Sequence, residues 1–106
     1  MPKYLFHGNY TTEGLKGVLK EGGTGRRSAV EKLVKSMGGT LEAFYFAFGD
    51  ADYFIIADLP DNSTASAVAL TVSASGAVTN KTTVLMAPED VDEAAKKHPS
   101  YRPPGQ

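Results

Sequence analysis

LEAFYFAFGDADYFIIADL, residues 41–59, contains two aromatic-rich apolar runs separated by the polar tetrapeptide Gly49-Asp50-Ala51-Asp52. Aromatic and branched side chains favour strands, and a polar turn that begins with glycine between two such runs is typical of a β-hairpin. Both runs are apolar on both faces, so neither face of the hairpin is suited to contact with water. We therefore expect helices to cover one face and a second copy of the chain to cover the other.

The segment before the hairpin predicts one strand and a helix in two parts. Residues 4–10 alternate in a way that places two sets of side chains on opposite faces of a strand. Thr11 and Thr12 offer a helix start, GGTG at residues 22–25 interrupts the helix, and residues 26–37 continue it with an apolar stripe. The two sets on the strand are Tyr4, Phe6 and Tyr10 on one face and Leu5, His7 and Asn9 on the other.

The segment after the hairpin predicts a helix, a fourth strand and a terminal helix. Pro60 ends the third strand, and Asp61 or Asn62 caps a helix rich in alanine and serine. Residues 78–86 return to a β pattern rich in threonine and valine. The last helix begins at Pro88 with an acidic first turn and a basic last turn, the polarity that the helix dipole favours. The basic residues of that turn are Lys96, Lys97 and His98.

The element order is β-α-β-β-α-β with an added C-terminal helix, which predicts an α+β, ferredoxin-like sandwich in a single domain over residues 1–106. The two crossover helices cover one face of such a sheet, and the open face becomes an interface or a ligand pocket. The Pro-rich tail, residues 99–106, is expected to be extended and to lie across a neighbouring subunit. On the second strand we expect Phe44, Phe46 and Phe48 to point one way and Leu41, Ala43, Tyr45 and Ala47 the other.

Composition is that of an ordinary soluble domain and argues against several classes of partner. The chain has 106 residues, of which 42% are hydrophobic and 22% are charged, enough for one core. A formal net charge of -1 gives no electrostatic footprint for nucleic acid or for an anionic membrane. The absence of cysteine excludes disulfides and thiolate catalysis and fits a reducing compartment. Since neither a signal peptide nor a long apolar stretch is found, we expect a cytoplasmic protein without nucleic-acid or membrane partners.

The chain resembles the GYD-domain family, small proteins named for a Gly-Tyr-Asp signature in the hairpin between the second and third strands. The resemblance runs over nearly the whole chain, through the opening at residues 10–23, EAFYFAFGDAD, DLPD, KTTVLMAPEDVD and the closing YRPPG. Ala51 stands where the signature leads one to expect an aromatic residue, with Tyr53 nearby. The resemblance implies a ferredoxin-like fold related to dimeric α/β barrels and a family whose biochemical function is largely uncharacterised.

His7 is the leading candidate for a functional side chain on the open face. Histidine can gain or lose a proton near neutral pH, which suits a general base or a proton relay. The simpler interpretation is a hydrogen-bonded histidine on a sheet face. Asn9, Tyr45 and Asn80 are expected to join His7 across the sheet, and the four residues form the candidate ligand-binding group.

Two loops carry further charged candidates. Arg26 and Arg27 follow the glycine-rich residues 22–25 and offer guanidinium groups to an anion, although a flexible joint between helical pieces also explains the glycines. Asp50 and Asp52 are too few for a dedicated cation site and suit a turn. No metal site and no cofactor are therefore expected.

Two functional hypotheses remain open. The first is a self-associating protein, a dimer or a larger assembly built on the open sheet face, which binds a small ligand there. The alternative is a cofactor-independent enzyme of the dimeric α/β-barrel class, of monooxygenase or isomerase type, in which His7 acts as the base. Because the sequence contains no complete catalytic set, the first hypothesis is favoured.

Overall fold

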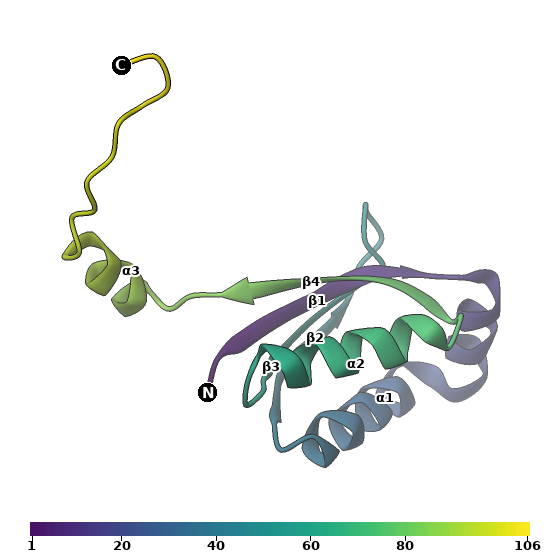
Figure 1. Ribbon diagram of the computed structural model, residues 1–106. Coiled ribbons are helices and arrows are strands. Elements are labelled where there is room, and N and C mark those ends of the chain that lie inside the picture. The colour runs from purple at the N-terminus through teal and green to yellow at the C-terminus, as the bar shows by residue number, and fades with distance from the viewer.

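The computed structural model describes residues 1–106 as a four-stranded antiparallel sheet with the two long helices on one face (Figure 1). The strand order is β2-β3-β1-β4, so the first strand lies in the middle and the hairpin strands lie on one side of it. The predicted α+β, ferredoxin-like arrangement with an added C-terminal helix is confirmed. The elements are β1 (Lys3–Tyr10), α1 (Thr12–Ser36), β2 (Thr40–Phe46), β3 (Tyr53–Asp58), α2 (Asn62–Ala74), β4 (Val78–Leu85) and α3 (Pro88–Ala95).

The core lies between the sheet and the helices α1 and α2. On β1 the alternation holds as predicted, since Tyr4 and Phe6 are buried on the helix side and His7 lies on the other face. Val34 of α1 and Val68 of α2 complete the core on the helix side of the sheet. None of the three helices has the length and the apolar character that crossing a lipid bilayer requires.

The register of β2 differs from the simple alternation that the sequence predicts. A bulge between Leu41 and Ala43 places one extra residue in β2, so Leu41 pairs with the buried Ala57 while Ala43 pairs with Ile56 on the open face. The expectation that Leu41 shares a face with Ala43 was wrong for this reason. Phe48 was also misplaced, because it lies beyond the end of β2 and is fully exposed.

Helix α1 is interrupted at one residue rather than at four. Only Gly22, at φ 81° and ψ 167°, leaves the helical conformation, and the helix resumes at once through the next glycines. The positive φ is one that glycine adopts without steric cost. The kink therefore directs residues 26–34 across the sheet as a continuous helix.

The C-terminal arm, residues 86–106, stands away from the sheet (Figure 1). No residue of α3 is buried, and the molecule extends over 57 × 32 × 22 Å. Pro88 begins α3 as predicted, but the helix ends at Ala95, so the basic residues Lys96 and Lys97 follow the helix instead of forming its last turn. An arm of this length gains no packing from its own domain.

Candidate functional site

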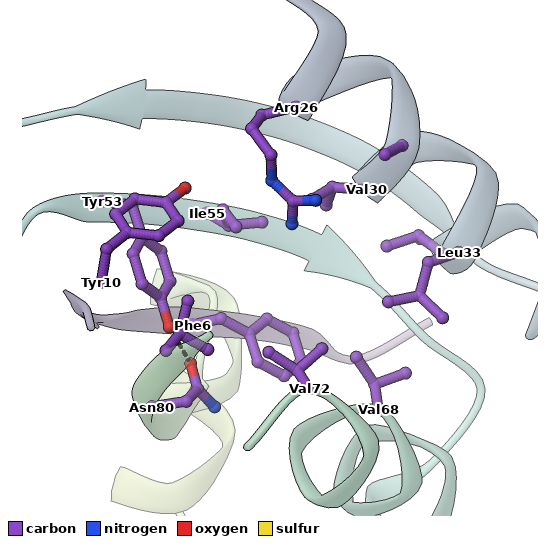
Figure 2. A pocket seen from close by; sticks show the side chains of 13 residues that line it. Phe6, Tyr10, Arg26, Val30, Leu33, Tyr53, Ile55, Val68, Val72 and Asn80 are labelled. Carbon is purple, nitrogen blue, oxygen red and sulfur yellow. Dashed lines mark hydrogen bonds between the residues drawn. The ribbon is translucent and has the colours of Figure 1, made fainter. Parts of the chain in front are cut away.

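A cavity of about 150 Å³ lies between the sheet and the helices α1 and α2 (Figure 2). Most of its wall is apolar, from side chains of β1, β3, β4, α1 and α2. Four residues with polar groups also line it: Tyr10, Arg26, Tyr53 and Asn80. We call this space the helix-side cavity.

Tyr53 and Asn80 meet over the middle strand. The Tyr53 hydroxyl donates to Asn80 Oδ1 at 2.8 Å, and the Asn80 amide donates to Thr82 Oγ1 at 3.0 Å. Gly8 pairs with both Tyr53 and Asn80, and a Cβ at this position would lie 1.8 Å from the Thr79 carbonyl oxygen. The missing side chain at Gly8 thus lets the β4 backbone at Thr79 approach β1 closely.

Tyr53 is buried and Tyr10 is half-buried, and both hydroxyls lose contact with water. Burial, with a smaller contribution from Tyr10, raises the pKa of Tyr53 to about 12. Burial also raises the pKa of Tyr10, although the positive charge of Arg26 opposes this shift. The two rings lie 5.4 Å apart between their centroids. Both hydroxyls are therefore neutral groups at physiological pH.

Arg26 extends from α1 into the cavity (Figure 2). Its Nε is buried without a hydrogen-bond partner, and its Nη1 lies 3.5 Å from Glu21 Oε1. The side chains of Arg26 and Glu21 are 33% and 43% exposed, so this ion pair is reached by water. The guanidinium consequently has hydrogen-bonding capacity that the protein does not use.

Arg27 takes a different position from Arg26, although the sequence suggests them as a pair. Arg27 is exposed and borders a separate shallow surface with Phe44 and Phe46. The structure thus assigns only Arg26 to the helix-side cavity. The sequence could not separate the two, because the direction of each side chain depends on where the helix resumes after Gly22.

A second hollow, of about 550 Å³, lies on the open face beside the turn of the hairpin. His7, Asn9, Ala47, Phe54 and Lys81 border it, and the hollow is open to solvent. The His7 ring stacks on Phe54 with a centroid distance of 5.9 Å and an interplanar angle of 9°. We call this space the open-face hollow.

Of the four residues predicted to form a ligand group, three share the open face. His7 and Asn9 border the open-face hollow, and Tyr45 pairs with Phe54, which in turn pairs with His7. Asn80 lies at the rim of both spaces, but its side chain bonds to Tyr53 on the helix side. The structure thus brings Asn80 to the same hollow as His7 and Asn9, while its amide oxygen is engaged by the Tyr53 hydroxyl.

Asp52 acts as a structural residue of the hairpin turn. Its carboxylate accepts a hydrogen bond of 2.9 Å from the Tyr10 backbone N–H. Its own N–H donates to the Gly8 carbonyl oxygen at 2.7 Å, so the turn is tied to β1 twice. No group of three potential metal ligands among His, Cys, Asp and Glu is present.

Sequence reasoning missed Tyr10 and Tyr53 as residues of a site. The signal was present on β1, where Tyr10 shares the parity of Phe6 and where a glycine interrupts that face. An isolated glycine within a strand often marks a close approach of other groups. It was the pairing of β1 with β3 and β4, a long-range property, that brought Tyr53 and Asn80 over this glycine.

Comparison with known proteins identifies a family and nothing finer. A family model described as the GYD domain matches residues 4–95. No curated protein and no solved structure matches the chain.

Proposed function

This chain belongs to the GYD-domain family, and from that starting point we propose that it is a homo-oligomer, at least a dimer, that joins through the open face of its sheet and binds a small ligand there. The observation that supports this most directly is the uncovered apolar surface on that face. Leu5 pairs with Ile56 at its centre, and Phe54 and Tyr45 pair beside them.

Two of these four side chains, those of Tyr45 and Phe54, are exposed, and those of Leu5 and Ile56 are half-buried. Tyr45 is 70% exposed and Phe54 is 40% exposed, and both lie on adjacent strands in direct register. Contiguous apolar patches of this kind on soluble proteins usually mark interaction sites. We call the surface formed by Leu5, Tyr45, Phe54 and Ile56 the open-face patch.

Charged residues lie at one end of the open-face patch. The Lys3 ammonium group bonds to Asp58 Oδ1 at 2.9 Å and also contacts the Glu42 carboxylate. An apolar centre bordered by polar and charged groups is the usual composition of a protein–protein interface. The same sheet face therefore offers both parts of such an interface.

The C-terminal arm supports the same proposal. Met86, Val91 and Tyr101 expose more than half of their surface, and the arm packs on no face of its own domain. Figure 1 shows α3 and the tail extending beyond the end of β4. An arm in this position can lie across a second copy, which would bury apolar side chains from both chains.

A second copy on the open face would also enclose the open-face hollow. His7, Asn9 and Lys81 would then offer an imidazole, an amide and an ammonium group to a small polar ligand. The His7 ring is positioned by stacking on Phe54 and has no side-chain hydrogen bond that orients it as a base. The geometry thus favours ligand binding over proton transfer by His7.

Substitution of the patch tests this proposal. Phe54→Asp should reduce the mass measured by light scattering to that of one chain, whereas Leu19→Asp, on the 86% exposed Leu19 of α1, should leave the oligomer unchanged. Tyr45→Glu serves as a second patch variant. Because Tyr45 is highly exposed, a charge at this position should not unfold the single chain. Circular dichroism confirms that each variant is folded. Unchanged mass in both patch variants would contradict the proposal.

A further inference from the structure

We propose that the helix-side cavity binds a small aromatic carboxylate of one ring, with the Arg26 guanidinium as the partner of the carboxylate. This site is on the opposite side of the sheet from the open-face patch. It is formed by a single chain. The inference therefore does not depend on the oligomeric state.

The size and the wall of the cavity fit one aromatic ring. Its volume is about 150 Å³, and an apolar engineered cavity of about that volume accepts benzene. Phe6 and Ile55 line it from the sheet, and Val68 and Val72 line it from α2. Burial of an uncharged ring against these side chains is favourable because it removes apolar surface from water.

Arg26 gives the cavity a preference for an anion. Its Nε is buried without a partner, and buried polar groups in folded proteins are normally hydrogen-bonded. A carboxylate can accept two parallel N–H bonds from a guanidinium, which satisfies such a group. A carboxylate would have to compete with the neighbouring Tyr10 hydroxyl and with the ion pair to Glu21, which at 3.5 Å and exposed to water is weak.

The remaining polar groups of the cavity are neutral and do not repel an anion. Burial raises the pKa values of Tyr10 and Tyr53, so both phenols keep their protons at physiological pH. The Tyr53 hydroxyl is held by Asn80 at 2.8 Å. Arg26 is thus the one charged side chain that lines the cavity, and the two carboxylates that act on Tyr10, those of Asp52 and Glu21, are not among the lining residues.

The experiment compares three probes by NMR titration of the isotopically labelled protein. Sodium benzoate should shift the methyl signals of Val30, Val68 and Val72 saturably, with a dissociation constant in the millimolar range or below. Benzyl alcohol, which has the ring without the charge, should bind about tenfold more weakly or worse. Inorganic phosphate should produce no saturable shift at these methyl groups.

Matched variants assign the binding to Arg26. Arg26→Gln should remove the preference for benzoate over benzyl alcohol, while Arg27→Gln, at the exposed neighbour, should retain it. Glu21→Gln should strengthen benzoate binding, because it removes the competing carboxylate. Val72→Phe fills the cavity and should abolish binding of both ring compounds, which keeps the test valid if Arg26→Gln does not fold.

Three results would overturn the inference. One is the absence of saturable shifts with benzoate at millimolar concentration. Another is equal affinity for benzoate and benzyl alcohol, which would remove the role of Arg26. The third is a set of benzoate shifts at Leu5, His7 and Phe54 instead of the cavity methyl groups. The titration is repeated on the Phe54→Asp variant, in which self-association through the open-face patch is removed. Benzoate binding that persists in this variant shows that the cavity proposal stands or falls independently of the proposed dimer.

Discussion

The Tyr53 hydroxyl reaches over the middle strand to the side chain of Asn80, and the two are joined by a hydrogen bond of 2.8 Å. Tyr53 belongs to β3 and Asn80 to β4, and both pair with Gly8 of β1. The bond thus ties three strands together at the floor of the helix-side cavity. Next to this bond the β4 backbone at Thr79 approaches Gly8 so closely that a side chain at this position of β1 would have no room.

Gly8→Ala is expected to be strongly destabilising. The new Cβ would lie 1.8 Å from the Thr79 carbonyl oxygen, a backbone atom of the paired strand that cannot move freely. We expect the free energy of unfolding to fall by about 2 kcal/mol or more. Denaturant titration at a fixed protein concentration measures the change.

Gly17→Ala is the matched control for this substitution. Gly17 lies within α1, and a Cβ there would meet nothing within 4 Å. Because alanine favours the helix, we expect the free energy of unfolding to rise by about 0.5–1 kcal/mol. Similar effects at Gly8 and Gly17 would show that the close approach at Gly8 has no energetic importance.

Tyr53 should make the folded state sensitive to alkaline pH. The pKa of Tyr53 is raised by burial from 10.0 to about 12, so above pH 10 the folded chain holds a proton that the unfolded chain has lost. The stabilisation is complete below pH 10 and is lost as the pH rises through the folded value. Denaturation measured from neutral pH to about pH 11 should show a steeper loss of stability in the wild type than in Tyr53→Phe.

The same variant has a second expected effect at neutral pH. Tyr53→Phe loses the bond to Asn80 and should lower the free energy of unfolding by about 0.5–1.5 kcal/mol. If the free energy of unfolding fell in parallel for wild type and Tyr53→Phe over the whole alkaline range, the Tyr53 hydroxyl would not be shielded as described.

Asp61 should make the stability of the folded chain sensitive to acid pH. Asp61 is the N-cap of α2, and hydrogen bonding from the Thr64 side chain, together with the Thr64 N–H at 2.8 Å, lowers the pKa of its carboxyl group below 3.8. The folded chain therefore binds fewer protons than the unfolded chain, so this stabilisation is present above pH 3.8 and disappears as the pH falls through the folded value. Asp61→Ala should be less stable than wild type at neutral pH, and the difference should shrink in acid.

Asp61→Asn is the control, because asparagine caps helices well but does not titrate. It should retain most of the neutral-pH stability and lack the acid dependence. If Asp61→Ala and Asp61→Asn lost stability equally at neutral pH, the cap would not be the source of the effect.

Local patterns in the sequence predicted the elements and most of the helix-side core. Alternation on β1 placed Tyr4 and Phe6 in the core, and Asp61 and Pro88 began their helices as expected. These features depend on neighbours along the chain, so they are visible in the sequence. The bulge at Leu41 is not, because the extra residue is recognised only from its pairing with β3.

The candidate site was less predictable, because it is assembled by long-range pairing. The position of Asn80 depends on the register between β1 and β4, in which His7 meets Lys81 and Gly8 meets Asn80. Arg26 enters the cavity because α1 loses helical geometry only at Gly22. Neither property has a local sequence signal.

The mass of the wild-type chain in solution is the measurement on which the proposed function most depends. One chain has a mass of 11.2 kDa, and light scattering over a series of micromolar concentrations should give at least twice that value. The reason is that the open-face patch, with Tyr45 at 70% and Phe54 at 40% exposure, would otherwise remain in contact with water. A constant mass of 11.2 kDa over the whole series would contradict the proposal that this face joins two copies.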